Sequence, residues 1–385
     1  MKKVGVIGCG VISRTYLRNI RSLFSKWIEV TTCADLSREN AEKLASEFDI
    51  PKVCEPRELL ESPQVEIVLN LTVPAAHYEI SCAALLAGKH VYSEKPLALE
   101  PEQVQDLTEL AEKSGLFLNC APDTFLSAPL RTCRRLIDEG WIGRPVAAVA
   151  NMVSYGNETW HPHPDFYYLR GGGPMMDMGP YYITALAALL GPVETASCFL
   201  SSAFQKRPVY SKPDWGRRME VEVPTHYSGA MKFTQGAIAS INMSFDVWMS
   251  NLPKLEIHGT QGSLILPDPN KFSGEVLLVR AENLIDEVAG LENSEAAGRL
   301  SRPEAREKLR PVPLLYRESK GDMRGLGLAN MVEAIESGRS NRETLDFIAH
   351  ISEVLLSFDR MDGGVYQMKT TCHRPPISCV TDEAG

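Results

Sequence analysis

The chain contains 385 residues, of which 44% are apolar, and it carries a formal net charge of −9 at pH 7. This length exceeds what one hydrophobic core usually supports, so we expect two domains. The negative charge argues against a surface for nucleic acid or anionic membrane, because both need a basic face, and no apolar run is long enough to span a bilayer.

The start of the chain and its cysteines bear on localisation. Met1 to Lys3 lead directly into a strand pattern rather than into the apolar core of a signal peptide. The nine cysteines are odd in number and have no metal-ligand spacing. We therefore expect a reduced, cytoplasmic protein whose thiols are free and mostly buried.

The first elements follow a dinucleotide-binding pattern. Lys3 to Ile7 is a short buried-strand pattern, a glycine-rich turn follows, and residues 14–24 have helical periodicity. The first glycine of such a turn permits its tight bend, the second lets the backbone approach a pyrophosphate, and free N–H groups at the helix start bind that anion. A serine stands in place of the third glycine. The residues expected at the pyrophosphate are Gly8, Gly10, Val11, Ile12 and Ser13.

A second strand, Ile28 to Ala34, ends in an acidic residue. Asp35 lies 22 positions after Ser13, close to the offset expected for the acid that binds the adenosine ribose hydroxyls. Because a carboxylate there repels a 2′-phosphate, NAD is favoured over NADP. Leu36 and Arg38 are expected beside the adenosine, and Arg38 can accommodate a 2′-phosphate. The alternative is that Asp35 caps the helix of residues 38–48.

The next segments alternate between strand and helix patterns. Strands at residues 65–71, 90–93 and 116–119 are separated by helices at about 75–87 and 101–114. Strands joined by helices of this length predict a parallel, doubly wound sheet, hence the α/β class. Polar residues after the strand of residues 65–71 are expected to line the cofactor, although turn or cap chemistry explains each of them equally. They are Asn70, Thr72, Pro74 and His77.

The strand His90 to Ser93 ends in Glu94, Lys95 and Pro96. The carboxyl ends of strands in an open α/β sheet line the crevice in which such sheets bind ligands. We therefore predict that Lys95 is catalytic and, like Glu94, lies against the cofactor. A surface turn is the alternative.

A loop rich in aromatic residues and proline, Tyr155 to Tyr168, follows the strand of residues 145–153. Aromatic faces pack on sugar C–H groups, and histidine can bond sugar hydroxyls, so Trp160, His161 and His163 are predicted to bind substrate. No third ligand accompanies the two histidines, so no metal site is predicted. Asp123 is a further substrate candidate, with a helix cap before residues 126–138 as the alternative.

A run of three glycines precedes a predicted helix at Pro180 to Leu190. Asp177 and Tyr181 are four residues apart and would share one face of a helical turn. Both are predicted to be catalytic and Tyr182 to bind substrate, whereas a purely structural helix would use Asp177 as its cap and the tyrosines in its core.

The rest of the chain contains a run of strand patterns between residues 193 and 266, which predicts a mainly antiparallel sheet. His226 is a candidate substrate residue on that sheet. Residues 281–320 are predicted to form an exposed insertion with helical character, and residues 327–361 two terminal helices.

Three segments, Gly8 to Ser13, Ser93 to Pro96 and Gly171 to Tyr181, together resemble the glucose-fructose oxidoreductase/inositol dehydrogenase/MocA family. The resemblance implies a Rossmann domain (residues 1–122) and an α/β domain (residues 123–385) with a large, mainly antiparallel sheet. The terminal helices of the second domain are expected to pack back on the Rossmann domain. The resemblance also implies bound NAD, a sugar or cyclitol substrate and a homo-oligomer, either dimer or tetramer. Lys95 and Asp177 match the family's catalytic set, whereas Tyr181 stands where the family commonly has histidine.

Hydride transfer from a secondary alcohol needs a base for the hydroxyl proton and a donor that stabilises the developing alkoxide. Lys95 can be that donor. Tyr181 is expected to be the base, because an adjacent ammonium stabilises a phenolate, with Asp177 as an orienting group or the alternative base. We expect oxidation of a ring carbinol, C3 of a glucoside being a natural choice.

Two alternatives remain. One is a redox-neutral glycosidase that oxidises C3 transiently, eliminates the aglycone and reduces the product with the same cofactor. The other is a non-catalytic NAD-sensing protein, which would be expected to lose Lys95 or Asp177, yet both are present.

Overall fold

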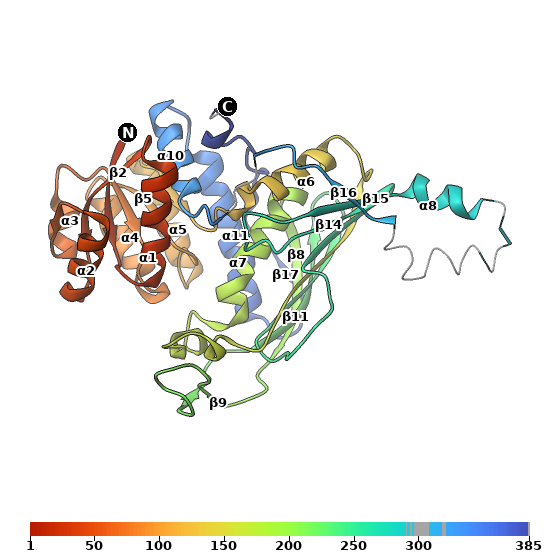
Figure 1. Cartoon of the computed structure of the whole chain (residues 1–385), viewed down its shortest axis with the longest axis horizontal. Coiled ribbons are helices and arrows are strands. Elements are labelled where there is room, and N and C mark those ends of the chain that lie inside the picture. The colour runs from red at the N-terminus through yellow and green to blue at the C-terminus, as the bar shows by residue number, and fades with distance from the viewer. Residues whose placement is uncertain (290, 293–294, 296–307, 318–320, 384–385) are drawn as a thin grey trace.

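The computed structural model describes residues 1–289, 291–292, 295, 308–317 and 321–383. Figure 1 shows two β-sheets side by side, with helices packed between them and the two chain ends close together. The predicted α/β class is confirmed.

The first sheet has six parallel strands in the order β3-β2-β1-β4-β5-β6. The strand order reverses between β1 and β4, and doubly wound sheets bind their ligands at this switch point. The predicted doubly wound parallel sheet is therefore confirmed. Its strands are β1 (Lys2–Ile7), β2 (Ile28–Ala34), β3 (Lys52–Val53), β4 (Ile67–Asn70), β5 (His90–Ser93) and β6 (Leu118–Cys120).

Five α-helices connect these strands. The first continues into a wider π-helical turn at Ile20–Phe24. Pro56 begins a short helix that the sequence analysis did not predict, because its six residues are too few to show a periodicity. The helices are α1 (Val11–Asn19), α2 (Arg38–Phe48), α3 (Pro56–Glu61), α4 (His77–Leu86) and α5 (Pro101–Ser114).

The second sheet has nine strands in the order β16-β15-β14-β13-β7-β12-β11-β8-β17. Its described pairs are antiparallel except for β7 with β12, so the prediction of a mainly antiparallel sheet is confirmed. Its strands are β7 (Pro145–Val153), β8 (Val193–Ser201), β11 (His226–Phe233), β12 (Ile238–Ser244), β13 (Leu255–Gly259), β14 (Gly262–Leu266), β15 (Val276–Arg280), β16 (Arg310–Val312) and β17 (Tyr366–Gln367).

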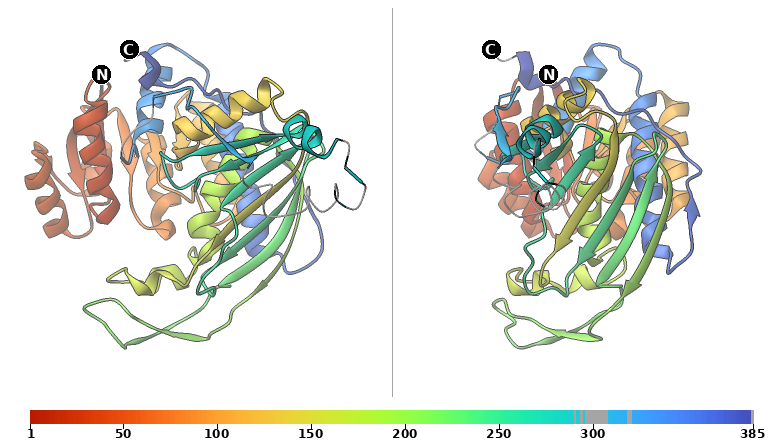
Figure 2. Two further views of the ribbon diagram at one scale, coloured as in Figure 1. Left: turned by 45° about the vertical axis from the view of Figure 1, so that its right-hand side comes forward. Right: turned by 90° about the vertical axis from the view of Figure 1, so that its right-hand side faces the viewer.

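Helices α7 (Gly173–Leu190) and α11 (Arg342–Arg360) cover one face of this sheet and lie between the two sheets (Figure 1). Helix α6 (Ala128–Asp138) packs beside α7, and α10 (Leu326–Glu336) returns to the β6 edge of the first sheet. Almost every residue of α7 is buried, because it has packing partners all round. In the described part of the chain, the opposite face of the nine-stranded sheet carries no helix layer (Figure 2).

Several boundaries differ from the predicted ones. Helix α7 begins at Gly173 rather than Pro180, because Pro174 fits a first helical turn and Gly173 takes the positive φ of 80° that precedes it. Asp177 is therefore inside the helix and is not its cap. Within the run of strands predicted between residues 193 and 266, β10 (Arg218–Glu220) does not join the large sheet but pairs with β9 (Lys206–Pro208) in a separate hairpin.

The predicted insertion at residues 281–320 is only partly described. Its first residues form helix α8 (Ala281–Val288), in agreement with the predicted helical character. Residues 310–312 return as β16, a strand that the sequence analysis did not identify. Residues 290, 293–294, 296–307 and 318–320 lie outside the described part of the chain.

Two further expectations can be compared with the structure. All nine cysteines are free and seven of them are buried, as their spacing predicted. Within the described residues, no helix is both long enough and apolar enough to cross a membrane.

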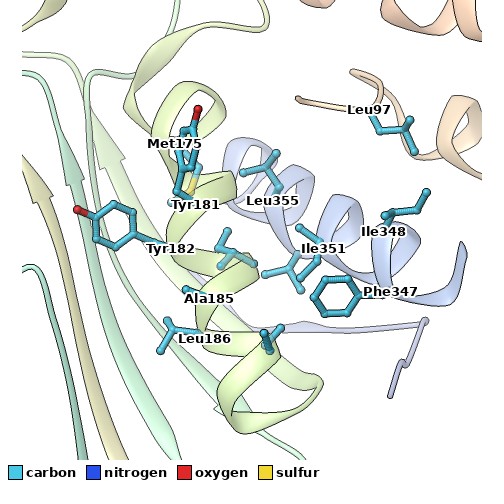
Figure 3. Packing of buried hydrophobic residues seen from close by; sticks show 14 of the residues in the cluster. Leu97, Met175, Tyr181, Tyr182, Ala185, Leu186, Phe347, Ile348, Ile351 and Leu355 are labelled. Carbon is cyan, nitrogen blue, oxygen red and sulfur yellow. The ribbon is translucent and has the colours of Figure 1, made fainter. Parts of the chain in front are cut away.

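The packing of α7 against α11 generates a stability prediction. Leu355 of α11 is 3% exposed, and a Cβ added at Gly179 of α7 would lie 3.1 Å from its Cδ1 atom (Figure 3). We expect Leu355→Ala to lower the free energy of unfolding by about 2–5 kcal/mol in urea denaturation, because the helices cannot close around the lost volume. The matched control is Leu86→Ala, whose side chain is 71% exposed and whose effect should stay within about 0.5 kcal/mol. Equal losses in both variants would contradict this packing.

Candidate active site

An ion pair joins the end of β5 to helix α7. Lys95 Nζ lies 2.9 Å from Asp177 Oδ1 and 2.5 Å from the backbone oxygen of Asp177. The two side chains are 14% and 17% exposed, so both retain access from outside. Burial opposes the charge of Lys95, but attraction by Asp177, Tyr181 and Glu94 outweighs it and raises the pKa of this ammonium above its ordinary value. Lys95 is therefore a fixed positive charge at the carboxyl edge of the first sheet.

Tyr181 lies one helical turn after Asp177 and shares its face of α7. Lys95 Nζ is 5.3 Å from the centroid of its ring, a cation–π distance. The structure thus brings together the three side chains that the sequence predicts to be catalytic.

Burial and nearby charges act in opposite directions on the pKa of Tyr181. Burial raises the pKa of its phenol, Lys95 and Arg324 lower it, and Glu94 raises it, with a net direction above the ordinary value. Lys95 thus stabilises the phenolate in the expected direction, but desolvation outweighs this attraction. Tyr181 is a protonated phenol near neutral pH.

Four residues near these side chains were missed by the sequence analysis. Arg324 Nη2 lies 3.4 Å from Tyr181 Oη, and Asn157 Nδ2 donates to Asp177 Oδ2 at 3.3 Å. Asn270 accepts a bond from Arg324, and the pKa of Tyr167 is raised by burial and by the charge of Asp177. Asn157 and Tyr167 belong to the aromatic loop Tyr155 to Tyr168, which the sequence does point to, whereas Arg324 and Asn270 lie in no recognisable motif and only the fold reveals them.

The glycine turn fits a pyrophosphate. Gly8 has a φ of 100°, and a Cβ there would meet backbone atoms of Leu71 at 2.5 Å, so only glycine fits. A Cβ at Gly10 would meet nothing within 4 Å, which leaves open space over the start of α1. Helix α1 has neither a side-chain cap nor an acidic residue in its first turn, so its N–H groups are free for an anion. Val11 is exposed there and Ile12 half-buried.

The side chain of Ser13 turns inward, so it is not the hydroxyl that contacts a cofactor. It is buried, and its hydroxyl donates to the Gly10 oxygen at 2.6 Å. Its side chain is small enough to allow close packing of α1 on the sheet, which is the usual role of the third glycine in this motif.

Asp35 is positioned beside the same turn. Its Oδ2 accepts a bond from the Cys9 N–H at 2.7 Å, and its Oδ1 accepts one from the Ser37 N–H at 2.8 Å. Ser37, rather than Asp35, caps α2, so the capping alternative is wrong. Leu36 is fully exposed next to it, and Arg38 pairs with Glu42 at 2.8 Å.

Two of the four residues predicted after β4 are structural. Asn70 is buried, donates to His77 O and Ser81 Oγ, and accepts bonds from both the backbone and hydroxyl of Thr72. His77 is also buried, with its ring nitrogens 2.6 Å from Pro96 O and 2.9 Å from Thr72 O. Neither has a free polar atom for the cofactor, and His77 instead joins the two loops at the sheet edge. Thr72 and Pro74 are half-buried at that edge.

Glu94 is buried beside Lys95. Its Oε1 accepts a bond from Tyr16 Oη at 2.8 Å and its Oε2 one from the Lys95 N–H at 3.0 Å. Its carboxylate therefore holds the loop that carries Lys95 and adds a negative charge beneath it.

Three predicted substrate residues are turned away from this site. Asp123 is buried and accepts bonds from the Gly325 and Gly327 N–H groups, so it anchors the start of α10. Tyr182 points toward the nine-stranded sheet (Figure 3), with its hydroxyl 3.4 Å from Asp268 Oδ1. His226 precedes Tyr227, which bonds Asp359 of α11, so alternation places His226 on the uncovered face of the sheet.

The aromatic loop lies beside the ion pair, where Asn157 bonds Asp177. Trp160 is exposed and its Nε1 donates to Asn157, the residue that bonds Asp177. His161 is buried, and burial lowers its pKa, so it is neutral near pH 7. His163 is exposed, and its backbone N–H donates to His161 Nδ1 at 3.1 Å.

A buried ion pair fixes this loop. Arg207 of β9 and Glu158 are both fully buried and 2.7 Å apart, and Arg207 also pairs with Asp246. The hairpin of β9 and β10 is thereby held against the loop that reaches the site.

A cavity of about 340 Å³ lies behind Lys95, along the β6 edge and beside α11. Lys95 and Pro180 are among the residues that line it, whereas Asp177 and Tyr181 are not. The cavity therefore reaches Lys95 from the side away from Asp177 and Tyr181.

Two family models match this chain: residues 2–121 match the oxidoreductase family with an NAD-binding Rossmann fold, and residues 130–265 match the GFO/IDH/MocA C-terminal domain. The chain is 30% identical to 1,5-anhydro-D-fructose reductase of Ensifer adhaerens, over 69% of this chain and 75% of that protein. It is 26% identical to trans-1,2-dihydrobenzene-1,2-diol dehydrogenase of Bos taurus, over 72% of this chain and 78% of that protein. Its fold is similar to that of levoglucosan dehydrogenase in complex with NADH, with a TM-score of 0.76 and 19% identity over 96% of this chain and 99% of that one.

The buried carboxyl of Asp123 generates a pH prediction. Burial raises its pKa to about 6, against the bonds from Gly327 and Gly325 and the charge of Arg324. Because the unfolded pKa is about 3.9, the contribution of Asp123 to stability is fully present below pH 4 and is lost as the pH rises through 6. Asparagine cannot ionise, so wild type should lose about 2 kcal/mol relative to Asp123→Asn between pH 4 and pH 7 in urea denaturation. A difference between the two proteins that does not change with pH would refute the assignment.

Proposed function

This chain belongs to the GFO/IDH/MocA oxidoreductase family, and we propose that it interconverts a secondary ring alcohol of a sugar, glycoside or cyclitol with the corresponding ketone, using NAD. The observation that carries this proposal is the meeting of Lys95, Asp177 and Tyr181 at the carboxyl edge of an NAD-binding Rossmann sheet. The relatives support the substrate class, because two of them are named for an anhydrosugar and levoglucosan.

The roles of the three side chains follow from their charges. Bound NAD supplies the hydride acceptor, or in reduced form the donor. Lys95 donates a hydrogen bond to the reacting oxygen and stabilises negative charge on it. Asp177 orients Lys95 through the 2.9 Å bond and can accept a bond from a neighbouring substrate hydroxyl. Tyr181 exchanges the hydroxyl proton, and its protonated state suits it to donate a proton to a ketone oxygen.

The cofactor residues are those of the glycine turn and of the acid after β2. The free N–H groups at the start of α1, next to Gly10, would hold the pyrophosphate, and Gly8 permits the turn. Asp35, fixed by the Cys9 and Ser37 N–H groups, would accept bonds from the adenosine ribose. Its charge favours NAD over NADP.

Trp160 and the neighbouring histidines would form the outer wall of the substrate site. Trp160 is exposed and is bonded to Asn157, so one aromatic face is available for the C–H side of a ring. C3 of a glucoside remains the carbon that we propose for oxidation.

We also propose how the chain divides into domains, how its copies associate and where it acts. The cofactor domain comprises residues 1–122 and the substrate domain residues 123–385, with α10 and α11 packing back on the cofactor domain. The uncovered face of the nine-stranded sheet would pair copies of the chain into a dimer or tetramer. Nine free thiols fit action in the reducing cytoplasm.

Replacing the lysine tests the proposed chemistry. We expect Lys95→Ala to abolish turnover in a panel of sugars, glycosides and cyclitols in which cofactor redox state and product are both followed, because the reacting oxygen loses its donor. NAD binding, measured by calorimetry, should persist, since the glycine turn is intact. Lys113→Ala removes a 73% exposed lysine of α5 as the control. An active Lys95→Ala enzyme would remove the assignment, and aglycone release by wild type without net reduced cofactor would assign the redox-neutral glycosidase instead.

Asp35→Asn tests the cofactor assignment. We expect about 10-fold to 100-fold weaker NAD binding, because two charge-assisted bonds to the ribose are lost. NADP binding should weaken less, since a charge that repels its 2′-phosphate is also removed. The control is Glu39→Gln, an exposed acid of the following helix. An unchanged ratio of NAD to NADP dissociation constants would show that Asp35 does not face the adenosine ribose.

A further inference from the structure

A second cation, the guanidinium of Arg324, lies beside the hydroxyl of Tyr181. Arg324 belongs to the segment just before α10, 143 residues after Tyr181. Its Nη2 lies 3.4 Å from Tyr181 Oη and donates to Asn270 Oδ1 at 2.8 Å. Its guanidinium carbon is 5.9 Å from the centroid of the Tyr181 ring, and its side chain is 15% exposed.

The backbone of this segment is fixed from both sides. Asn19 of α1 donates to Asp322 Oδ1 at 3.2 Å and to the Arg324 oxygen at 3.0 Å. Asp123 accepts bonds from the N–H groups of Gly325 and Gly327. Arg324 is therefore a preorganised group, held by the helix whose start would bind the pyrophosphate.

The charges around Tyr181 come from several elements. The loop after β5 contributes Lys95 and Glu94, and the segment before α10 contributes Arg324 with its partner Asp322. Asp177 precedes Tyr181 on α7, and Tyr167 of the loop before α7 is a further titratable neighbour. Lys95 and Arg324 are thus the two positive charges that act on the phenol, and each has an acidic partner that holds it in place.

We propose that Arg324 is a positioning residue that holds the Tyr181 hydroxyl and, with Lys95, prepares it for proton exchange with the substrate oxygen. The inference rests on the proposed function for its catalytic consequence. The step itself moves one proton and no electrons: in the oxidative direction the substrate O–H bond breaks and an O–H bond forms on the Tyr181 phenolate. A phenolate at this buried position needs nearby positive charge, because burial disfavours it.

The direction of the effect follows from the charges. Both cations lower the pKa of Tyr181, while burial raises it above its ordinary value. Removing Arg324 leaves burial and Lys95, so the pKa of Tyr181 should rise further. Arg324→Lys keeps a positive charge and should retain most of the effect.

The first test is the pH profile of kcat/KM for alcohol oxidation. In Arg324→Gln, we expect the limb of the profile that reports ionisation of Tyr181 to move to higher pH by about one unit. At pH values below that limb, kcat/KM should therefore fall about tenfold. Arg324→Lys should remain close to wild type. Arg57→Gln removes an exposed arginine of α3 and should leave the profile unchanged. The proposal would be overturned if this limb lay at the same pH in Arg324→Gln as in wild type, whatever the rate of the variant.

A second measurement does not depend on turnover. 3-Fluorotyrosine at position 181, titrated by ¹⁹F NMR in the NAD-bound protein, reports ionisation of this phenol directly. Its midpoint should be higher in Arg324→Gln than in the Arg324 parent, and the same midpoint in both would overturn the inference. If wild type oxidises no member of the substrate panel, the proposed function fails, and the NMR comparison still decides the role of Arg324.

Discussion

The ion pair between Lys95 and Asp177 is the interaction on which the rest of the site depends. It connects the loop after β5 of the parallel sheet to α7, a helix that packs against the nine-stranded sheet. Removing either partner would leave the other charge in a mostly desolvated position, which is strongly unfavourable. The pair therefore fixes how β5 and α7 meet, and with them the position of Tyr181.

The surroundings of the pair are organised to maintain it. Glu94 holds the loop that carries Lys95, and His77 joins that loop to the one after β4. Asn157 bonds the far oxygen of Asp177 and brings the aromatic loop to the same place. Several residues that sequence patterns assign to ligand binding therefore act instead on the loops that carry the reactive groups.

Much of the fold could be predicted because its signals are local. Strand and helix periodicity, the glycine turn and the acid after β2 depend on neighbours in the chain, and Lys95 stands at a strand end that such sheets use for chemistry. The orientation of side chains could not be predicted in the same way. Asn70, Asp123 and His226 are polar residues near the right elements, but their direction depends on tertiary partners such as Gly325. Arg324 was missed because only the fold brings it to Tyr181.

The most direct test is a crystal structure of the protein with NAD and a bound sugar or cyclitol. The account predicts a nicotinamide C4 about 3.5 Å from one ring carbon, whose oxygen is bonded by both Lys95 Nζ and Tyr181 Oη. A nicotinamide ring remote from these two groups, or a substrate bound to a different face of α7, would contradict it.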